Sequence, residues 1–264
     1  FGQGNKSVGT IVAISSYASY FWQPIMNLGN IFNNFINNIA YLERIFETMD
    51  EPVTVKDAKD AVEMPKIRGE VTFDHVNFSY DASKQILNDV SFTVKPGESV
   101  ALVGPTGAGK STIVNLISRF YNVNGGRVLI DGQDISQVTI HSLREQMGIM
   151  MQDSFIFSGD IEDNIRYGKL DATHEEIVKA SRTVCADEFI SKMPDRYQTE
   201  VRERGSMLSQ GQKQLISFAR TLLSDPAILI LDEATSSIDV QTEKALQTGL
   251  NAMLKGRTSF IIAH

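Results

Sequence analysis

The sequence predicts an α/β fold in which parallel strands alternate with helices and a helical segment interrupts the sheet. Three observations predict this fold. A glycine-rich loop over residues 104–112 lies between the apolar run 100–103 and a helical pattern starting at Ile113. Residues 227–231 are continuously apolar, as a strand buried on both faces is, and residues 258–263 look like the next such strand. Residues 153–225 have helical patterns with charged faces, and strands alternating with helices indicate an α/β sheet.

Composition sets the class of protein. The chain has 264 residues, 42% of them hydrophobic, which suits one or two globular domains and excludes a disordered chain. Its net charge of −7 lacks the basic excess of nucleic-acid-binding proteins, so we expect no nucleic acid partner. The single Cys185 excludes an internal disulfide and fits a reducing compartment. The chain starts at Phe1 and stops at His264 in an apolar run, so we expect a fragment cut at both ends.

The first part of the chain predicts a membrane span. No charged residue occurs from Ser7 to Leu42, and a helix needs about 20 apolar residues to cross a bilayer. We expect the span over Val8 to Leu28, with its polar side chains facing other helices or a cavity. The alternative is a buried helix of a soluble protein. The polar residues concerned are Ser15, Ser16, Ser19, Gln23 and Asn27.

A helical pattern continues beyond Pro24, a residue expected to kink the helix. Apolar residues recur at steps of three and four, and asparagines lie between them, which predicts one long helix ending before residues 50–52. Residues 1–49 are therefore expected to form this helix, 50–68 a linker, and 69–264 a separate domain. The recurring apolar residues are Ile31, Phe35, Ile39, Leu42, Ile45 and Met49.

The second domain is expected to begin with strands. Apolar residues alternate from Val71 to Phe73 and then, on the opposite parity, from Val76 to Tyr80, which predicts a strand with a bulge near residues 74–75. Further strands are predicted over residues 90–94, 127–130 and 148–151.

The glycine-rich loop has the spacing Gly-x-x-x-x-Gly-Lys-Ser, the signature of a phosphate-binding loop. A strand, a glycine loop and a helix in succession direct backbone N–H groups and the positive helix end at one point, where a phosphate fits. Lys110 would reach the β and γ phosphates and Ser111 would ligate Mg²⁺. The alternative is a glycine turn before an ordinary helix. The expected nucleotide contacts are Gly104, Pro105, Thr106, Gly107, Ala108, Gly109, Lys110, Ser111 and Thr112.

Two carboxylates follow the buried strand 227–231. A carboxylate at the end of a central strand, beside a phosphate loop, is in the place where Mg²⁺ is held. We assign Asp232 to the metal, directly or through water, and Glu233 to the general base that orients the attacking water.

Ser209 and Gln212 open a helical pattern that two hypotheses explain equally well. Ser209 with Gln212 three residues later forms a capping box, so this is simply a well-made helix start. The same geometry also presents a hydroxyl and unpaired N–H groups to an anion. Both interpretations stay open on the residues alone.

Residues 208–212, Leu-Ser-Gln-Gly-Gln, resemble the signature motif of ATP-binding cassette (ABC) proteins, and the resemblance extends over residues 69–264. Two departures are Gln210 and Arg202, which stand where the family usually has glycine. The resemblance implies a nucleotide site completed by a partner through Ser209, Gln210, Gly211, Gln212 and Asp239. It assigns Tyr80 to the adenine ring, Gln152 to Mg²⁺ and the membrane domain, Glu203 to a cross-loop of exporters, and His264, as a catalytic switch, to the γ-phosphate.

The resemblance also implies an architecture and an activity. The expected fold is a phosphate-loop NTPase core with a mixed, largely parallel sheet, an antiparallel β subdomain and a helical subdomain at about 153–225. The expected activity is ATP hydrolysis with Mg²⁺ in a half-transporter of the multidrug, lipid or peptide export type, preceded by its last transmembrane helix. Two such domains, identical or different, would dimerise around ATP. The protein would be a multi-pass protein of the plasma (inner) membrane, with this domain cytoplasmic and the exported substrate unknown.

Two alternatives belong to other classes. One is a non-transport ABC ATPase acting on DNA, which would need a coiled-coil insertion and basic surfaces. The other is the soluble ATPase subunit of an importer. Membrane partitioning of residues 1–49 would separate both from the exporter.

Overall fold

The computed structural model describes residues 3–81, 83–150, 155–232 and 240–263. It divides into two compact units, Phe1–Thr54 and Val55–His264, which are described separately.

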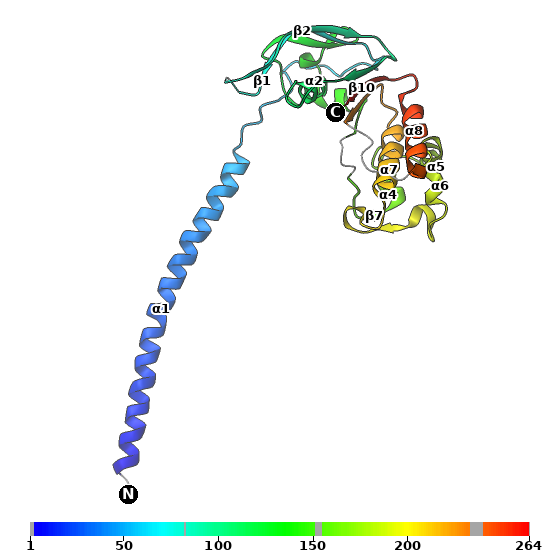
Figure 1. Ribbon diagram of the computed structural model, residues 1–264. Coiled ribbons are helices and arrows are strands. Elements are labelled where there is room, and N and C mark those ends of the chain that lie inside the picture. The colour runs from blue at the N-terminus through cyan, green and yellow to red at the C-terminus, as the bar shows by residue number, and fades with distance from the viewer. Residues whose placement is uncertain (1–2, 82, 151–154, 233–239, 264) are drawn as a thin grey trace. The chain divides into compact units, whose positions relative to one another are not determined.

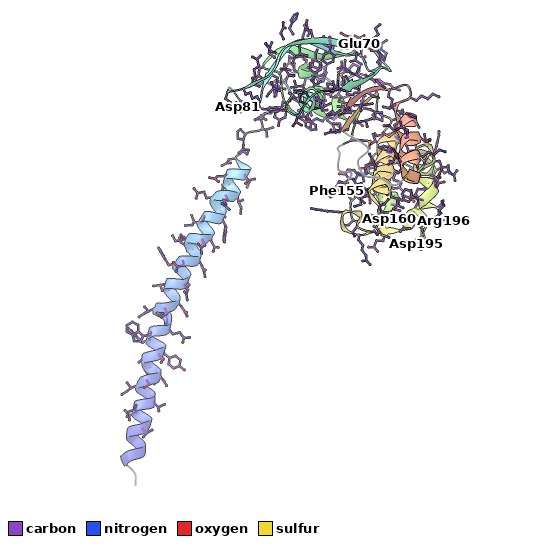
Figure 2. All side chains as sticks on the ribbon, in the orientation of Figure 1. Glu70, Asp81, Phe155, Asp160, Asp195 and Arg196 are labelled. Atoms are coloured by element: carbon purple, nitrogen blue, oxygen red, sulfur yellow. The ribbon has the colours of Figure 1, made fainter. Side chains whose placement is uncertain are left out.

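The first unit consists of one helix, α1 (Gln3–Met49), which continues through Pro24. Its 47 residues form a rod roughly 70 Å long at 1.5 Å per residue. Its side chains radiate on all sides, and every described side chain from Val8 onward is exposed (Figure 2). The single long helix ending before residues 50–52 is confirmed.

The membrane span expected over Val8 to Leu28 is not supported. Among the described residues, no helix combines the length and the apolar character that crossing a membrane requires. The reason lies in the sequence, because hydroxyl and amide side chains such as Ser15, Ser16 and Gln23 interrupt the apolar residues and lower the mean hydropathy.

The second unit is built around a four-stranded parallel sheet (Figure 1). Each of its strands is predominantly apolar, as a sheet covered on both faces requires. The strands expected near 100–103, 148–151, 227–231 and 258–263 are confirmed, and so is the α/β fold class. In spatial order they are β3 (Ser99–Leu102), β10 (Thr258–Ile262), β9 (Ile228–Asp232) and β6 (Met147–Met150).

A second, antiparallel sheet contains β1 (Val71–Ser79), whose register with its neighbour shifts between Phe73 and Val76. The predicted bulge is therefore confirmed, and His75 within it has a positive φ of 51°. The antiparallel subdomain that the resemblance implied is also present. In spatial order this sheet contains β2 (Gln85–Val94), β1, β4 (Gly125–Ile130) and β5 (Gln133–Asp134).

The helical part packs α4, α5 and α8 against α7, which is amphipathic and buries Phe218 and Ile216 (Figure 1). Residues 153–225, in which the sequence shows no convincing strand, also contain a ladder of two-residue strands, β7 (Gly159–Asp160) and β8 (Glu200–Val201). Two residues are too few for an alternating pattern to show in the sequence. The helices are α4 (Ile161–Arg166), α5 (His174–Thr183), α6 (Asp187–Ile190), α7 (Gln210–Leu223) and α8 (Val240–Leu254), with short 3₁₀ turns η2 (Arg196–Gln198) and η3 (Glu203–Gly205).

The segment before β1 has no helix or strand of its own but lies on the second unit. Met64 and Ile67 are buried in its core. The Met64 N–H donates to Ser142 Oγ at 2.7 Å, and the Ile67 N–H donates to Gln146 Oε1 at 2.8 Å. The Asp131 carboxylate accepts from the backbone N–H groups of residues 68–70. Side chains from distant parts of the chain thus hold this segment in place.

Gly126 is expected to tolerate no side chain, because an added Cβ would lie 2.2 Å from the His75 carbonyl oxygen and 2.4 Å from that of Asp74. Both atoms are backbone atoms of the β1 bulge and have no room to move. We expect Gly126→Ala to lower the free energy of unfolding by at least about 2 kcal/mol. Gly132→Ala is the matched control, since Gly132 has a similar φ of +79° but open space around it. Gly132→Ala should lower the free energy of unfolding by only about 1 kcal/mol, through backbone strain at the positive φ. Urea unfolding monitored by circular dichroism measures both, and equal losses would contradict the clash.

Candidate active site

The glycine-rich loop connects β3 to α2 (Lys110–Ile117) in the predicted order of strand, loop and helix. Gly104, Gly107 and Gly109 have φ values of +147°, +86° and +91°, which side chains disfavour. Gly109 also lies against the antiparallel sheet, where an added Cβ would be 3.0 Å from the Leu87 side chain. The glycines therefore permit both the turn and the close packing that direct the start of α2 toward the loop.

Lys110 is only 7% exposed although it is charged. Its Nζ donates to the carbonyl oxygens of Gly104 at 2.6 Å and Pro105 at 3.3 Å, so the ammonium lies inside the loop. Its acceptors within the described part of the chain are neutral carbonyls, and a buried cation with such partners gains strongly from an anion that enters the loop. The loop and Lys110 thus form a site for a negatively charged group of phosphate size.

Asp232 ends β9 at the same edge of the sheet as the loop. Ile262 of β10 pairs with Leu102 on one side and with Asp232 on the other, so the three residues form one row across the sheet. Two strand spacings separate the Leu102 and Asp232 backbones, about 10 Å. A half-buried carboxylate and a phosphate loop at this separation can share a ligand that carries both phosphate and a metal ion.

Tyr80 lies beside the start of α2. Its hydroxyl is 3.1 Å from Thr112 Oγ1, and its ring makes an edge contact with Tyr121 at 4.9 Å between centroids. Tyr80 is 48% exposed, so one part of the ring remains open to a planar ligand. Its predicted role in stacking stays a prediction, and its position near the loop fits that role.

An open pocket of about 180 Å³ is lined by the loop, the start of α2 and residues at the antiparallel sheet. The sequence analysis missed Ile86 of β2 in its lining, because the expected strand began only at residue 90. Ile86 precedes Val90 by four residues, an even spacing that places both on one face of a strand, and this spacing could have predicted the longer strand. The lining residues are Tyr80, Ile86, Thr106, Gly107, Gly109, Lys110, Ser111 and Thr112.

Ser209 is the N-cap of α7. Its Oγ accepts from the Gln212 N–H at 3.3 Å, and the Gln212 Oε1 accepts from the Ser209 N–H at 2.9 Å. The capping box is therefore present. Ser209 and Gln210 are exposed, whereas Gly211 is buried, so the N-cap of α7 lies at the surface. Among the described residues that line the loop pocket, none comes from α7.

Several predicted residues lie outside the part of the chain that the structure describes: Gln152, Glu233, Asp239 and His264. In the sequence, Glu233 directly follows the last residue of β9, and Gln152 and His264 follow β6 and β10 by two residues. Their assigned roles remain predictions.

The residues assigned to Mg²⁺ have a suitable chemical character. Mg²⁺ prefers oxygen ligands and usually takes one or two from a protein, with phosphates and water completing the set. The exposed Ser111 hydroxyl at the start of α2 and the Asp232 carboxylate provide such oxygens. Within the described ranges, no three His, Cys, Asp or Glu side chains gather as a metal cluster. The site therefore fits a metal that arrives with phosphate.

Comparison with known sequences identifies related proteins. The family described as ABC transporter matches residues 87–236. Over 258 residues the chain is 52% identical to the uncharacterized ABC transporter ATP-binding protein YknV of Bacillus subtilis, covering 98% of this chain and 43% of that protein. It is 44% identical over 261 residues to the fatty acid ABC transporter ATP-binding/permease protein of Mycobacterium tuberculosis, covering 99% of this chain and 41% of that protein. The chain thus spans less than half the length of these relatives.

A solved structure shows the same fold. It is a bacterial Atm1-family ABC exporter with ATP bound, which is 41% identical and superposes with a TM-score of 0.77. The match covers 100% of this chain and 46% of the exporter chain, so it includes α1 as well as the second unit.

Proposed function

The chain belongs to the ABC transporter family, whose ATP-binding domains hydrolyse ATP, and from this premise we propose that it is the ATP-hydrolysing part of a membrane exporter. The observation that carries the proposal is the buried Lys110 ammonium inside a glycine loop, with Asp232 at the same sheet edge. Neither the DNA-acting ATPase nor the importer subunit is favoured, because relatives that match nearly the whole chain are named ATP-binding/permease proteins.

The loop and Lys110 hold the triphosphate. Backbone N–H groups of the loop, other than that of Pro105, which has none, donate to its oxygens, and Lys110 exchanges its two carbonyl partners for the β and γ phosphates. Tyr80 packs on the adenine ring from the antiparallel sheet. The nucleotide thus contacts both sheets of the second unit.

Ser111, Asp232 and, through the family resemblance, Gln152 hold Mg²⁺. When bound, Mg²⁺ neutralises charge on the β and γ phosphates. Glu233 accepts a proton from the water that attacks the γ-phosphorus, and His264 contacts the γ-phosphate and orients that water. The water oxygen bonds to phosphorus as the bond to the β–γ bridging oxygen breaks, which leaves ADP and phosphate.

A second ATP-binding domain, identical or different, completes the site. Its residues equivalent to Ser209, Gln210, Gly211, Gln212 and Asp239 close over the phosphates. Ser209 and Gln210 at the start of α7 are exposed and do not line this chain's own loop pocket, which supports this division of the site. ATP then holds two domains together, and its hydrolysis lets them separate.

Closure of the two domains drives export. We place α1 in the permease portion, because the named ATP-binding/permease relatives match through it. The complete protein lies in the plasma (inner) membrane as a multi-pass protein with this domain in the cytoplasm. The region of Gln152 transmits closure to the membrane domain. The exported substrate stays unassigned.

Substitution of Ser209 separates capping from phosphate contact. Aspartate is a good N-cap, so Ser209→Asp should leave the free energy of unfolding nearly unchanged. A carboxylate facing the partner's γ-phosphate repels it, and ATP hydrolysis should fall about 100-fold or more. Ser209→Ala should lose about 1 kcal/mol of stability through the cap. Urea unfolding and phosphate release measure the two effects. Full hydrolysis by Ser209→Asp would show that Ser209 only caps the helix and would count against the shared site.

A further inference from the structure

The far end of the phosphate-loop helix is closed by an unusual residue. The Arg119 N–H donates to the Leu116 carbonyl at 3.0 Å, and the Phe120 N–H donates to that of Asn115 at 2.9 Å. This is the pattern in which a left-handed residue, usually glycine, follows a helix. Arg119 adopts φ 51° there. An arginine at a position that favours glycine indicates that its side chain is needed.

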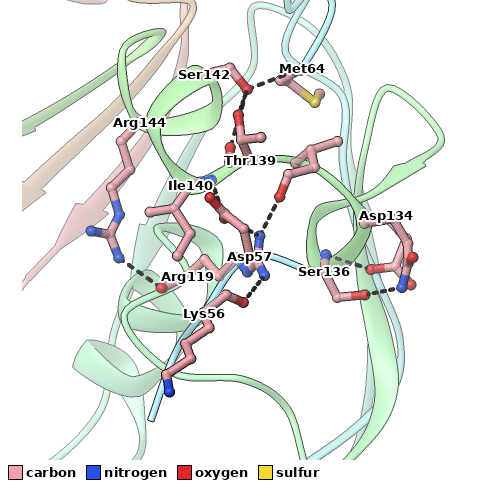
Figure 3. Close-up of polar contacts among 12 residues, drawn as sticks. Lys56, Asp57, Met64, Arg119, Asp134, Ser136, Thr139, Ile140, Ser142 and Arg144 are labelled. Atoms are coloured by element: carbon pink, nitrogen blue, oxygen red, sulfur yellow. Dashed lines mark hydrogen bonds and ion pairs between the residues drawn. The ribbon is translucent and has the colours of Figure 1, made fainter. Parts of the chain in front are cut away.

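The Arg119 side chain reaches the segment that precedes β1. It is buried, with a residue exposure of 2%. Its guanidinium donates to the Val138 carbonyl and, at 3.0 Å, to the Lys56 carbonyl, and it lies 3.8 Å from the Asp57 carboxylate (Figure 3). Asp57 also accepts from the Ile140 N–H at 2.8 Å. One buried arginine thus joins the end of α2 to residues 56–57.

A second arginine holds the same helix end from another side. Arg144 of α3 (Ile140–Arg144) donates to the carbonyl oxygens of Ser118 at 3.0 Å and Arg119 at 2.8 Å. Its guanidinium also lies 4.5 Å above the Phe120 ring. These carbonyls would otherwise lack a helical partner. The end of α2 is therefore fixed to α3 as well as to the segment before β1.

We call residues 55–68, the segment that contains Lys56 and Asp57, the strap. Contacts with the rest of the second unit hold it along its length. Val62 pairs with Val138 through two backbone hydrogen bonds, on either side of the Arg119 contact. Met64 is held by Ser142, which also contacts Thr139 (Figure 3). The strap therefore belongs to the body that contains α2.

We propose that Arg119 is a positioning residue that fixes the strap to the end of the phosphate-loop helix, so that nucleotide-dependent movement of α2 passes through the strap to α1. The inference rests on the proposed function. Lys110 at one end of α2 contacts the phosphates, and Arg119 lies beyond the other end of this eight-residue helix, about 12 Å away. Only residues 50–54 separate α1 from the strap. The route needs no contact other than those described and the chain itself.

The experiment uses the full-length protein in membrane vesicles with Glu47→Cys on α1 as a reporter. Cys185→Ser removes the native thiol, whose pKa burial already raises. The rate of maleimide labelling is measured with and without Mg²⁺-ATP. One test variant carries a flexible Gly-Ser insertion after Pro52, which leaves the strap and its contacts intact. The matched control carries the same insertion at Gly256, a turn with open space around it. A third variant, Arg119→Lys, keeps the charge but loses the fork that reaches two carbonyls.

The parent and the Gly256 control should show a several-fold change in labelling rate on adding Mg²⁺-ATP. The insertion after Pro52 and Arg119→Lys should each lose the part of that change that passes through the strap and keep the part that passes through the region of Gln152, while affinity for a fluorescent ATP analogue stays within about twofold. A change as large as the parent's in the insertion variant or in Arg119→Lys, or a parent without any change, would overturn the inference. A parent that does not bind the analogue would instead overturn the proposed function.

Discussion

Lys110→Ala is expected to lower the rate of ATP hydrolysis by about 100- to 1000-fold. The Lys110 side chain is itself buried, and there a positive charge interacts with phosphate more strongly than it would in water. Alanine leaves the carbonyls of Gly104 and Pro105 without their donor and the β and γ phosphates without their cation. Affinity for ATP should fall together with the rate, because the lysine contacts bound ATP as well as the transition state. Phosphate release and binding of a fluorescent ATP analogue measure both quantities.

The control for Lys110 is Lys192→Ala, which removes an exposed lysine of the helical part. It should leave hydrolysis unchanged, which excludes a general effect of making the net charge of −7 more negative. Circular dichroism of Lys110→Ala should show an intact fold. A Lys110→Ala protein that folds and still hydrolyses ATP at the normal rate would show that the loop is not part of the active site.

Glu233→Gln should slow hydrolysis by about 100- to 10,000-fold while ATP still binds. Glutamine keeps the size of the side chain and can still contact water, but it does not accept a proton. Because closure around ATP precedes hydrolysis, the variant should accumulate as a closed dimer. Phosphate release and light scattering with Mg²⁺-ATP measure the two effects in the full-length protein.

Asp232→Asn separates the metal from the base. It should weaken the Mg²⁺-dependent part of ATP binding, whereas Glu233→Gln should leave that part unchanged. Normal turnover by Glu233→Gln would assign the base to another residue. Equal loss of Mg²⁺-ATP binding in both variants would mean that the two carboxylates share one role.

The sequence predicted the local parts of this unit well, because their signals are contiguous. The loop at residues 104–112, the apolar run before Asp232 and the bulge after Phe73 each occupy one short stretch. The membrane span was expected from the lack of charge in residues 7–42, whereas no described helix is apolar enough to cross a membrane. The ladder of β7 and β8 was not predicted, because a strand of two residues is too short to show an alternating apolar pattern.

The strap was not predicted, because its contacts are distant in the sequence. Asp131 lies 61 to 63 residues beyond the N–H groups that it caps, and Arg119 reaches back to Lys56. Charged residues and Pro65 in the strap are typical of a linker, and only the partners reveal its attachment. Ser209 shows a different limit. The same geometry is suited to capping a helix and to binding an anion. Only a substitution such as Ser209→Asp distinguishes these two roles.

The row formed by Leu102, Ile262 and Asp232 has a further consequence for how this site tolerates change. The interval between the phosphate loop and the proposed metal ligand is fixed by main-chain ladders, which every sequence with this topology shares. Drift of the surrounding core side chains can therefore alter how readily the unit melts while the interval itself remains constant. The geometry of the active site and the stability of the unit can therefore evolve separately.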